Sequence, residues 1–421
     1  MNLLPGGPPP SVFNTCHAHV VHVVDNNYLQ VRDHQRQAIK DAAVFYNVHK
    51  SGQVVLPTGA GKSGVAVLLP YYMNHSRVLV VAPSPDLAEQ FAAQFSGPVL
   101  TTTSPIPARR DDAFFFKANL DVANGSPSLQ GTPANRRIIL PTHALALNAD
   151  AAKRLFDRDL LVINREKFQG PRTRLQVEQF RTDYDLLIVD EAHHYPAATW
   201  KKIVDHFAHV PTKVLFLTAT PNEDRNTPPV AKIYELNFLD AVRDHAIRDI
   251  IWNEVSGPPG QALEKLVEHL KTVVGTLDGE GHFYQAMIAF PTVGTTSEAN
   301  DVVNLYNAGV ARPRERAEAC TQESAAGVAN RFKKNEFRTV VVVHKLMEGF
   351  DHPDVAFVVV ARNMKMRPFN QFVGRATRID DGRVQFAQVI SHQVFNQESN
   401  FHAMRHGTWA IAQDDEEEDD E

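Results

Sequence analysis

The 421-residue sequence has little of what would place it in a specialised class of protein. Two cysteines, Cys16 and Cys320, are too few for a disulfide framework or a cysteine-rich zinc site, which agrees with a reducing compartment. No apolar run approaches the length that spans a membrane. No lysine or arginine precedes Arg32, so the N-terminus lacks the charged start of a secretory signal and the arginines of a mitochondrial presequence. We therefore expect a globular protein of the cytoplasm or nucleus, without membrane contact.

The negative charge of the chain is concentrated at its C-terminus. The formal net charge is −6, but residues 414–421 are all acidic and the remainder carries +2. A near-neutral body can still present a basic groove, so composition does not exclude nucleic acid as a partner. The acidic end is either a solvated tail or a competitor for such a groove.

The chain is too long for one ordinary core and long enough for two domains. Short apolar runs at 78–82, 186–189 and 213–217 alternate with helical patterns, and a second series follows at 285–290, 339–343, 355–360 and 386–391. This alternation predicts an α/β fold with two doubly wound, mostly parallel sheets. Residues 19–24 read as a further strand, 233–255 as a helical connector, and 101–137 as an elaborated surface loop. The expected organisation is a flexible segment 1–25, a first domain 26–228, a connector 229–260, a second domain 261–400 and an acidic tail 401–421.

Four residues near the N-terminus have the side-chain types of a metal site. They are Cys16, His17, His19 and His22. A full set of four ligands at suitable spacing is not evident, and alternation over 19–24 is explained more simply by a strand, so metal is the less favoured interpretation.

A phosphate-binding loop is predicted between the strand 54–56 and a helical run from Gly64. Glycines at 59 and 61 let backbone amides turn toward phosphate oxygens at the helix N-terminus. Lys62 would reach the β- and γ-phosphates of ATP, and Ser63 would place its hydroxyl on Mg²⁺. The general pattern has glycine where this chain has Leu56, and the competing interpretation is a glycine turn with an exposed lysine. The predicted loop comprises Thr58, Gly59, Ala60, Gly61, Lys62 and Ser63.

Two carboxylates follow the apolar strand 186–189. Asp190 stands at its carboxyl end, where ligands of open parallel sheets bind, and would hold the metal. Glu191 would orient or deprotonate the attacking water.

The run Asp190-Glu191-Ala192-His193 spells DEAH, and over residues 31–378 the chain resembles a superfamily 2 helicase of the DEAD/DEAH type. Among these helicases it resembles the branches of XPB, the type I and III restriction motors and the mitochondrial helicases. The resemblance implies two tandem RecA-like domains, ATP and Mg²⁺ as cofactors, and a DNA or RNA partner.

The resemblance also implies roles for residues in the other motifs. In the catalytic group, Gln371 joins the hydrolytic water network and two arginines face the γ-phosphate. Gln35 would read the adenine base, although Gln37 competes for that role. The two arginines at the γ-phosphate are Arg375 and Arg378, and the nucleotide would also be contacted by Gly349 and Asp351. Contacts with nucleic acid are implied for Pro83, Ser84, Asn164, Lys167, Thr220, Pro291 and Thr292. Coupling between ATP and nucleic acid is implied for His193 and Thr218.

Alternatives remain open at this point. Arg375 and Arg378 could be surface helix arginines, and Asp351 could cap a turn before Pro353. The leading hypothesis is an ATP-dependent helicase or translocase. The others are a nucleic-acid-binding scaffold with weak ATPase activity, and the motor subunit of a larger restriction, defence or repair assembly whose nuclease or accessory function lies on a protein partner.

Overall fold

The computed structural model of the chain describes most of two α/β units. The first compact unit comprises residues 1–56 and 61–235, and the second comprises residues 236–421 together with the short stretch 57–60. The described residues are 11–26, 31–84, 87–88, 91, 95, 159–164, 184–194, 198–207, 212–221, 230–278, 283–290, 296–321, 324–342, 352, 354–379 and 386–407.

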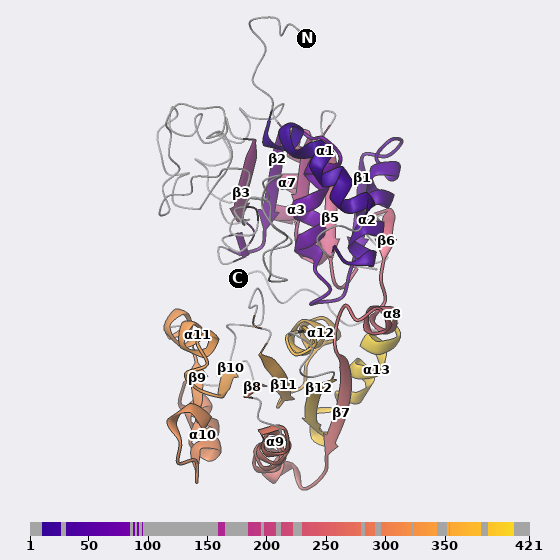
Figure 1. The fold of residues 1–421 in the computed structure, drawn as a ribbon. Helices are drawn as coiled ribbons and strands as arrows, with labels where there is room; N and C mark the ends of the chain where they lie inside the picture. Colours follow the sequence, from indigo (N-terminus) through magenta and orange to yellow (C-terminus); the bar gives the residue numbers. More distant parts are fainter. Residues whose placement is uncertain are drawn as a thin grey trace, which may run out of the picture. The chain divides into compact units, whose positions relative to one another are not determined.

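The first unit is built on a six-stranded parallel sheet with the order β3-β2-β4-β5-β1-β6 (Figure 1). Most of these strands are buried, valine- and leucine-rich runs, which is typical of a parallel sheet covered on both faces, whereas the edge strand β6 is only partly buried. They are β1 (Ser51–Val55), β2 (Val78–Ala82), β3 (Leu160–Asn164), β4 (Leu186–Val189), β5 (Lys213–Thr218) and β6 (Lys232–Glu235).

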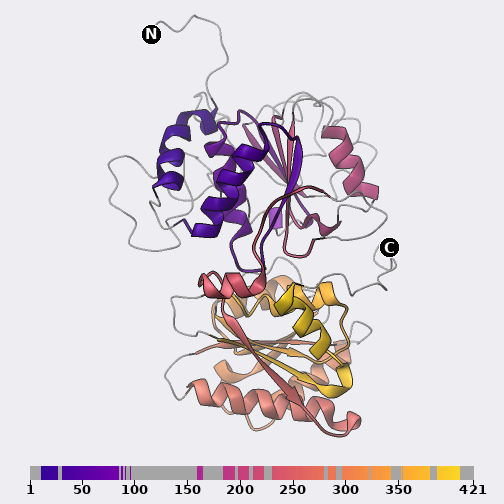
Figure 2. The same cartoon turned by 90° about the vertical axis from the view of Figure 1, so that its right-hand side faces the viewer.

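Helices cover the two faces of this sheet (Figure 2). On one face lie α1 (Val12–Asp25), α2 (Asp33–Phe45) and α3 (Lys62–Tyr72), and on the other lies α7 (Ala198–Phe207). The α7 helix places the fully buried Trp200 in a core with the β2, β4 and β5 side chains. Packing of this kind fixes the strands whose carboxyl ends carry the site described below.

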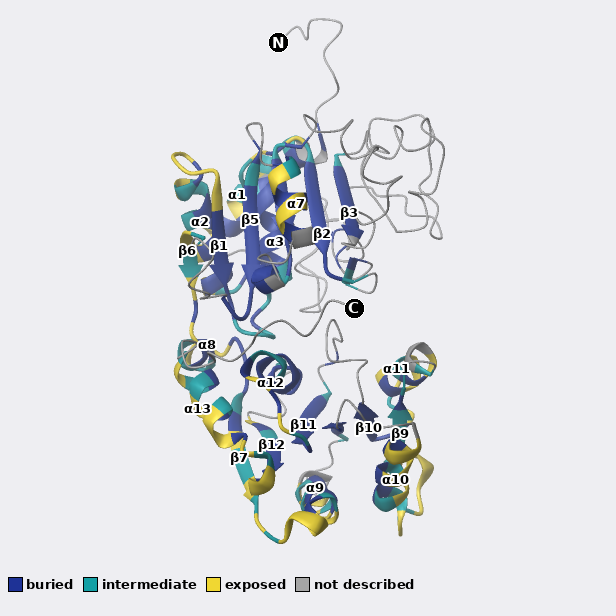
Figure 3. Cartoon of the chain, turned by 180° about the vertical axis from the view of Figure 1, so that it is seen from behind, coloured by how far each residue is buried: buried dark blue, intermediate teal, exposed yellow. Residues whose placement is uncertain are grey.

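The second unit repeats the architecture, with the parallel order β7-β12-β11-β8-β10-β9. Its central strands are buried throughout (Figure 3). The strands are β7 (Asp249–Val255), β8 (Gln285–Ala289), β9 (Ala317–Cys320), β10 (Thr339–Val342), β11 (Val355–Val360) and β12 (Phe386–His392). The helices are α8 (Phe238–Arg243), α9 (Ala262–Asp278), α10 (Thr296–Asn307), α11 (Ala325–Lys333), α12 (Met366–Val373) and α13 (Glu398–His406), and short 3₁₀ turns occur at Ala192–His194, Pro259–Gln261, Pro313–Glu315 and Gln393–Phe395. No helix in the described residues is both long and apolar enough to cross a bilayer.

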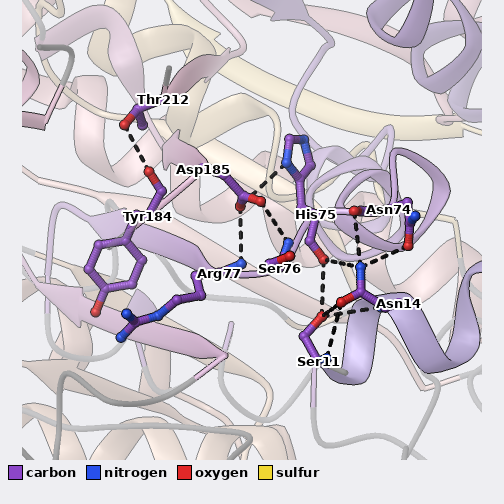
Figure 4. A network of polar contacts seen from close by, with 9 residues as sticks. All are labelled: Ser11, Asn14, Asn74, His75, Ser76, Arg77, Tyr184, Asp185 and Thr212. Carbon is purple, nitrogen blue, oxygen red and sulfur yellow. Dashed lines mark hydrogen bonds and ion pairs between the residues drawn. The ribbon is translucent and has the colours of Figure 1, made fainter. Parts of the chain in front are cut away.

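A polar network ties the amino ends of β2 and β4 together (Figure 4). The Asp185 carboxylate accepts backbone N–H bonds from Ser76 at 2.7 Å and Arg77 at 3.0 Å, and lies 3.4 Å from His75 Nδ1. Burial alone would raise the pKa of Asp185, but the His75 contact and the two N–H donors outweigh it and hold that pKa below its ordinary value. In the same network Asn14 of α1 donates to the carbonyl oxygens of Asn74 and His75, which anchors α1 at this end of the sheet.

Most predicted strands lie where the sequence places them, and the predicted fold class is confirmed. Two expectations are wrong. Residues 19–24 form no strand, because Ser11 caps a helix, α1, whose apolar residues Phe13, Val20, Val23 and Val24 recur at helical spacing and are buried. Residues 12–25 are therefore an ordered part of the first unit and no flexible segment.

The second wrong expectation is the helical connector over 233–255. Only α8 is helical there, while β6 joins the first sheet beside β1 and β7 joins the second beside β12. Both are edge strands and are only partly buried, so their mixed apolar and polar residues mimic the pattern of a surface helix.

Candidate active site

The predicted phosphate loop lies between the buried strand β1 and the helix α3. Gly59 and Gly61 have φ values of 89° and 90°, in the left-handed region that favours glycine, and Gly61 is the N-cap of α3. The turn is closed by the Ala60 N–H, which donates to the Pro57 carbonyl at 3.1 Å. Lys62 and Ser63 then form the first turn of α3, where unbonded backbone N–H groups favour an anion.

Gln35 of α2 packs directly on this loop. Its Nε2 donates to the Gly61 carbonyl at 2.8 Å, and its Oε1 accepts from the Arg32 N–H at 3.1 Å. A Cβ at Gly61 or Gly64 would lie 2.4 or 2.5 Å from Gln35 Nε2, so both glycines are needed for this contact. The competing residue, Gln37, instead donates to Asp41 along the exposed side of α2.

The two predicted carboxylates stand at the carboxyl end of β4, which lies between β2 and β5. Asp190 is buried, and its N–H donates to the Val81 carbonyl at 3.0 Å. Glu191 has a left-handed backbone, with φ of 48°. That conformation brings its Oε1 to 3.8 Å from Lys62 Nζ and its Oε2 to 3.3 Å from His193 Nδ1. Residues of the phosphate loop and of the DEAH run thus meet within the first unit.

The electrostatics of Asp190 suit a divalent cation. Burial first, and then the negative charge of Glu191, raise the pKa of Asp190 above its ordinary value, although the Lys62 ammonium opposes the shift. A buried carboxylate beside a like charge is stabilised by added positive charge. Together with the hydroxyl of Ser63, these oxygen donors are of the kind that Mg²⁺ prefers, so the residues present fit that ion.

The predicted coupling and strand-contacting residues of the first unit follow neighbouring strands. Thr218, at the end of β5, donates its Oγ1 proton to the Thr220 carbonyl at 3.0 Å and accepts from the Thr220 N–H at 3.1 Å, so two hydrogen bonds close this turn. Pro83 and Ser84 come directly after β2, and Asn164 ends β3. All of these positions lie at the carboxyl edge of the same sheet as the phosphate loop.

The predicted arginine motif belongs to the second unit. Gln371 lies on α12 and is buried, and α12 ends in a turn over 374–377. Arg375 within this turn is 5% exposed, and its N–H donates to the Phe372 carbonyl at 3.1 Å. Arg378 follows and is partly exposed. A surface-helix interpretation does not fit Arg375, because a surface arginine would be solvated.

Some predicted residues lie outside the described part of the chain. They are Lys167, Pro291, Thr292, Gly349 and Asp351, together with the 101–137 loop, the acidic residues 414–421 and the side chain of Asn164. Among the described residues, no group of three or more His, Cys, Asp or Glu side chains could hold a metal ion, and His17 Nδ1 lies 2.9 Å from the Tyr71 carbonyl oxygen.

Sequence reasoning missed two features of the site. The left-handed backbone of Glu191 has no sequence signal, because glutamate has no preference for that region. Arg248, a buried residue before β7, donates to the arginine turn of the second unit. It lies 128 residues from Ala376, and only the folded sheet brings the two together.

Comparisons with known proteins match parts of both units. Residues 28–223 match the family described as type III restriction enzyme, res subunit, and residues 288–394 match type I restriction enzyme subunit R domain 3. A curated relative, UvrABC system protein B of Ureaplasma parvum serovar 3, is 27% identical over 54% of this chain and 37% of its own length.

Two solved structures share the fold. A fragment of a putative HsdR subunit of a type I restriction enzyme from Vibrio vulnificus YJ016 is 17% identical, with a TM-score of 0.60 over 88% of this chain and 66% of its own. The helicase Lhr of Mycobacterium smegmatis, bound to single-stranded DNA and AMP-PNP, is 16% identical, with a TM-score of 0.57 over 92% of this chain and 50% of its own. The chain therefore spans between about a third and two thirds of the length of these relatives.

Proposed function

Because the chain belongs to the superfamily 2 helicase-like family, we propose that it is an ATP-dependent nucleic-acid translocase or helicase, whose two α/β units are tandem RecA-like domains. The observation that carries this proposal is the meeting of Lys62 with Glu191 at 3.8 Å, directly beside the buried Asp190. Lys62 and Glu191 are 129 positions apart and come from different strand ends. Such an arrangement supports binding of a nucleotide phosphate and activation of a water next to it.

The residues of the first unit have separate roles in this proposal. The backbone of residues 58–61 and the Lys62 ammonium hold the β- and γ-phosphates, while Glu191 orients and deprotonates the attacking water. Ser63 and Asp190 would hold Mg²⁺, which neutralises phosphate charge when bound. Gln35 positions the loop through Gly61 and can still offer its second N–H and a lone pair to the adenine base.

The second unit supplies the complementary positive charge. Arg375 and Arg378 would stabilise the γ-phosphate in the transition state, and Gln371 would join the water network. We assign nucleotide contacts to Gly349 and Asp351, and nucleic-acid contacts to Pro83, Ser84, Asn164, Lys167, Thr220, Pro291 and Thr292. Thr218 and His193 would transmit the nucleotide state, since His193 contacts Glu191 and Thr218 fixes the turn that carries Thr220.

A second candidate is the motor subunit of a restriction or repair assembly. It is favoured by the two restriction-enzyme families that the chain matches. In that case a protein partner supplies the nuclease or accessory function. Purification from the native source under mild conditions separates the two candidates, because a motor subunit would co-purify with a fixed partner.

The proposed activity is tested by ATP turnover with single-stranded and duplex DNA and RNA side by side. We expect stimulation by at least one of the four. Replacement of Arg375 or Arg378 by alanine should slow stimulated turnover by about 10³-fold or more while nucleotide binding changes little, since arginines delivered in this way act on the transition state. Lysine at 375 should rescue poorly, because its point charge cannot reproduce the planar guanidinium fork. Near-normal stimulated rates in all three variants would instead favour a nucleic-acid-binding scaffold.

A further inference from the structure

Arg248 is a buried arginine at the amino ends of the second sheet, just before β7. It is 2% exposed. Its Nη1 donates to the Val355 carbonyl at 3.0 Å and to the Ala376 carbonyl at 3.3 Å. Its own N–H donates to the Thr377 carbonyl at 2.6 Å. Its guanidinium lies 6.0 Å from the centre of the Tyr284 ring.

These contacts join three segments that are far apart in the sequence. Val355 begins β11, Ala376 and Thr377 belong to the turn after α12, and Arg248 itself ends the segment that leads from α8 into β7. Two of the three hydrogen bonds end on residues 376 and 377, which lie between Arg375 and Arg378. Arg248 is therefore bonded to the turn that contains Arg375 and directly precedes Arg378.

Arginine suits this place for a physical reason. Buried carbonyl oxygens need donors, and the guanidinium is a rigid, permanently charged fork that can serve two of them at once. A flexible lysine ammonium would satisfy the charge without fixing the angle between the two carbonyls.

We propose that Arg248 is a positioning residue of the hydrolysis site, which holds the turn 374–377 so that Arg375 and Arg378 are correctly aimed. This inference rests on the proposed function, because its consequence for turnover requires that the two arginines act on ATP. Its structural part, the order of the turn, stands by itself and can be measured separately.

Arg338 provides a matched control in the same sheet. It is 3% exposed, and its Nη1 donates to the Tyr284 carbonyl at 3.1 Å. Its guanidinium lies 4.2 Å from the centre of the Phe283 ring. Arg338 is thus another buried arginine that bonds a backbone carbonyl near Tyr284, but none of these contacts reaches the turn 374–377.

The first measurement is hydrogen exchange of the Arg375 and Ala376 amides, which in the native chain donate to Phe372 and Val373. Arg248→Met should speed their exchange by about tenfold, a factor that corresponds to losing roughly one net hydrogen bond. Arg248→Lys should have an intermediate effect. Arg338→Met should leave these two amides unchanged. Unchanged exchange in Arg248→Met, or equal acceleration in Arg338→Met, would overturn the proposal whether or not the chain hydrolyses ATP.

The second measurement is stimulated ATP turnover. Arg248→Met should lower kcat by about 10²-fold with little change in equilibrium ATP binding, the loss expected for misplacement of catalytic groups by about 1 Å. Because Arg248 acts partly through Arg375, adding Arg248→Met to Arg375→Ala should cause a clearly smaller loss of kcat than Arg248→Met causes in the wild-type chain. Multiplying effects in the double variant, or an equal loss of kcat in Arg338→Met, would show that Arg248 is a general stabiliser of the fold. If wild-type turnover were absent, the proposed function would fail while the exchange result still decided the role of Arg248.

Discussion

Glu191 combines a proposed catalytic role with an unfavourable backbone conformation. At φ of 48° it lies in the left-handed region, which costs an ordinary residue about 1–2 kcal/mol. Glycine avoids that cost but loses roughly 0.5–1 kcal/mol more conformational entropy on folding. The backbone change in Glu191→Gly should therefore stabilise the first unit by about 0–1.5 kcal/mol, while the water-orienting carboxylate is lost. The wild-type residue is expected to sacrifice some stability for function.

Glu191→Gln separates the two effects, because glutamine keeps the strained backbone and the side-chain length but removes the charge. We expect Glu191→Gly to melt up to about 6 °C above Glu191→Gln, given roughly 2–4 °C per kcal/mol for a unit of this size. Both variants should lose turnover by about 10²–10⁴-fold, the usual contribution of a general base. Glu191→Gln should still bind Mg·ATP, since Asp190 and Lys62 are intact.

His245 is the control for the backbone term. It also has a left-handed backbone, with φ of 52°, and its side chain is exposed. His245→Gly should raise the melting temperature by a similar amount. A melting temperature for Glu191→Gly below that of Glu191→Gln would refute the strain argument. Near-normal turnover in Glu191→Gln would refute the role in catalysis.

The remaining predictions concern the phosphate loop and the opposite edge of the sheet. Lys62→Ala should abolish ATP turnover, because the phosphates lose their nearest fixed cation, and a radiolabelled-phosphate assay would show wild-type-like release if the loop assignment were wrong. Gly64→Ala should weaken equilibrium ATP binding by about tenfold, because the new Cβ lies 2.5 Å from Gln35 Nε2 and displaces a hydrogen bond to the loop. The control is Gly275→Ala in α9, where a Cβ would have no atom within 4 Å, and this variant should bind ATP as the wild type does. Asp185→Asn should lower the free energy of unfolding by about 1 kcal/mol at pH 7, after allowance for solvent screening. Since the pKa of Asp185 is lowered in the folded state, the difference in unfolding free energy between wild type and Asp185→Asn should be complete above the ordinary carboxyl pKa. The difference should vanish as the pH falls through the folded-state pKa. Urea titrations that show the same difference at every pH would contradict this prediction.

The strands were predictable because of where they lie in the sheets. β2, β4 and β11 begin and end at the predicted residues, since each is a central parallel strand buried on both faces and reads as an unbroken apolar run. The helix α1 and the edge strands β6 and β7 were not predictable from local composition. For α1, a cap at Ser11 and helical spacing outweigh a run of β-branched valines. For β6 and β7, partial burial leaves no continuous run to recognise.

The candidate site also contains parts that the sequence predicts and parts that it does not. The phosphate loop and the Asp190–Glu191 pair are local motifs, and a strand ending at each was sufficient to predict that they share one edge of the sheet. The pairing of Gln35 with Gly61, and with it the need for glycine at 64, depends on how α2 packs against α3. That packing is a tertiary contact, for which the sequence around Gln35 contains no periodic signal.

The segment 236–248 shows why the difference between a plain connector and a segment with tertiary contacts matters for mechanism. If this segment were only a connector, it would do no more than link two domains, and its residues could vary freely. In the structure it leads through α8 to Arg248, which bonds both β11 and the turn between Arg375 and Arg378 before the chain enters β7. A motor that delivers arginines to a phosphate requires their turn to move as one body with its sheet, because any slack there would reduce the force and the precision of delivery. If the proposed roles of Arg375 and Arg378 are correct, Arg248 would meet that requirement with a single side chain, at the point where the chain enters the second sheet.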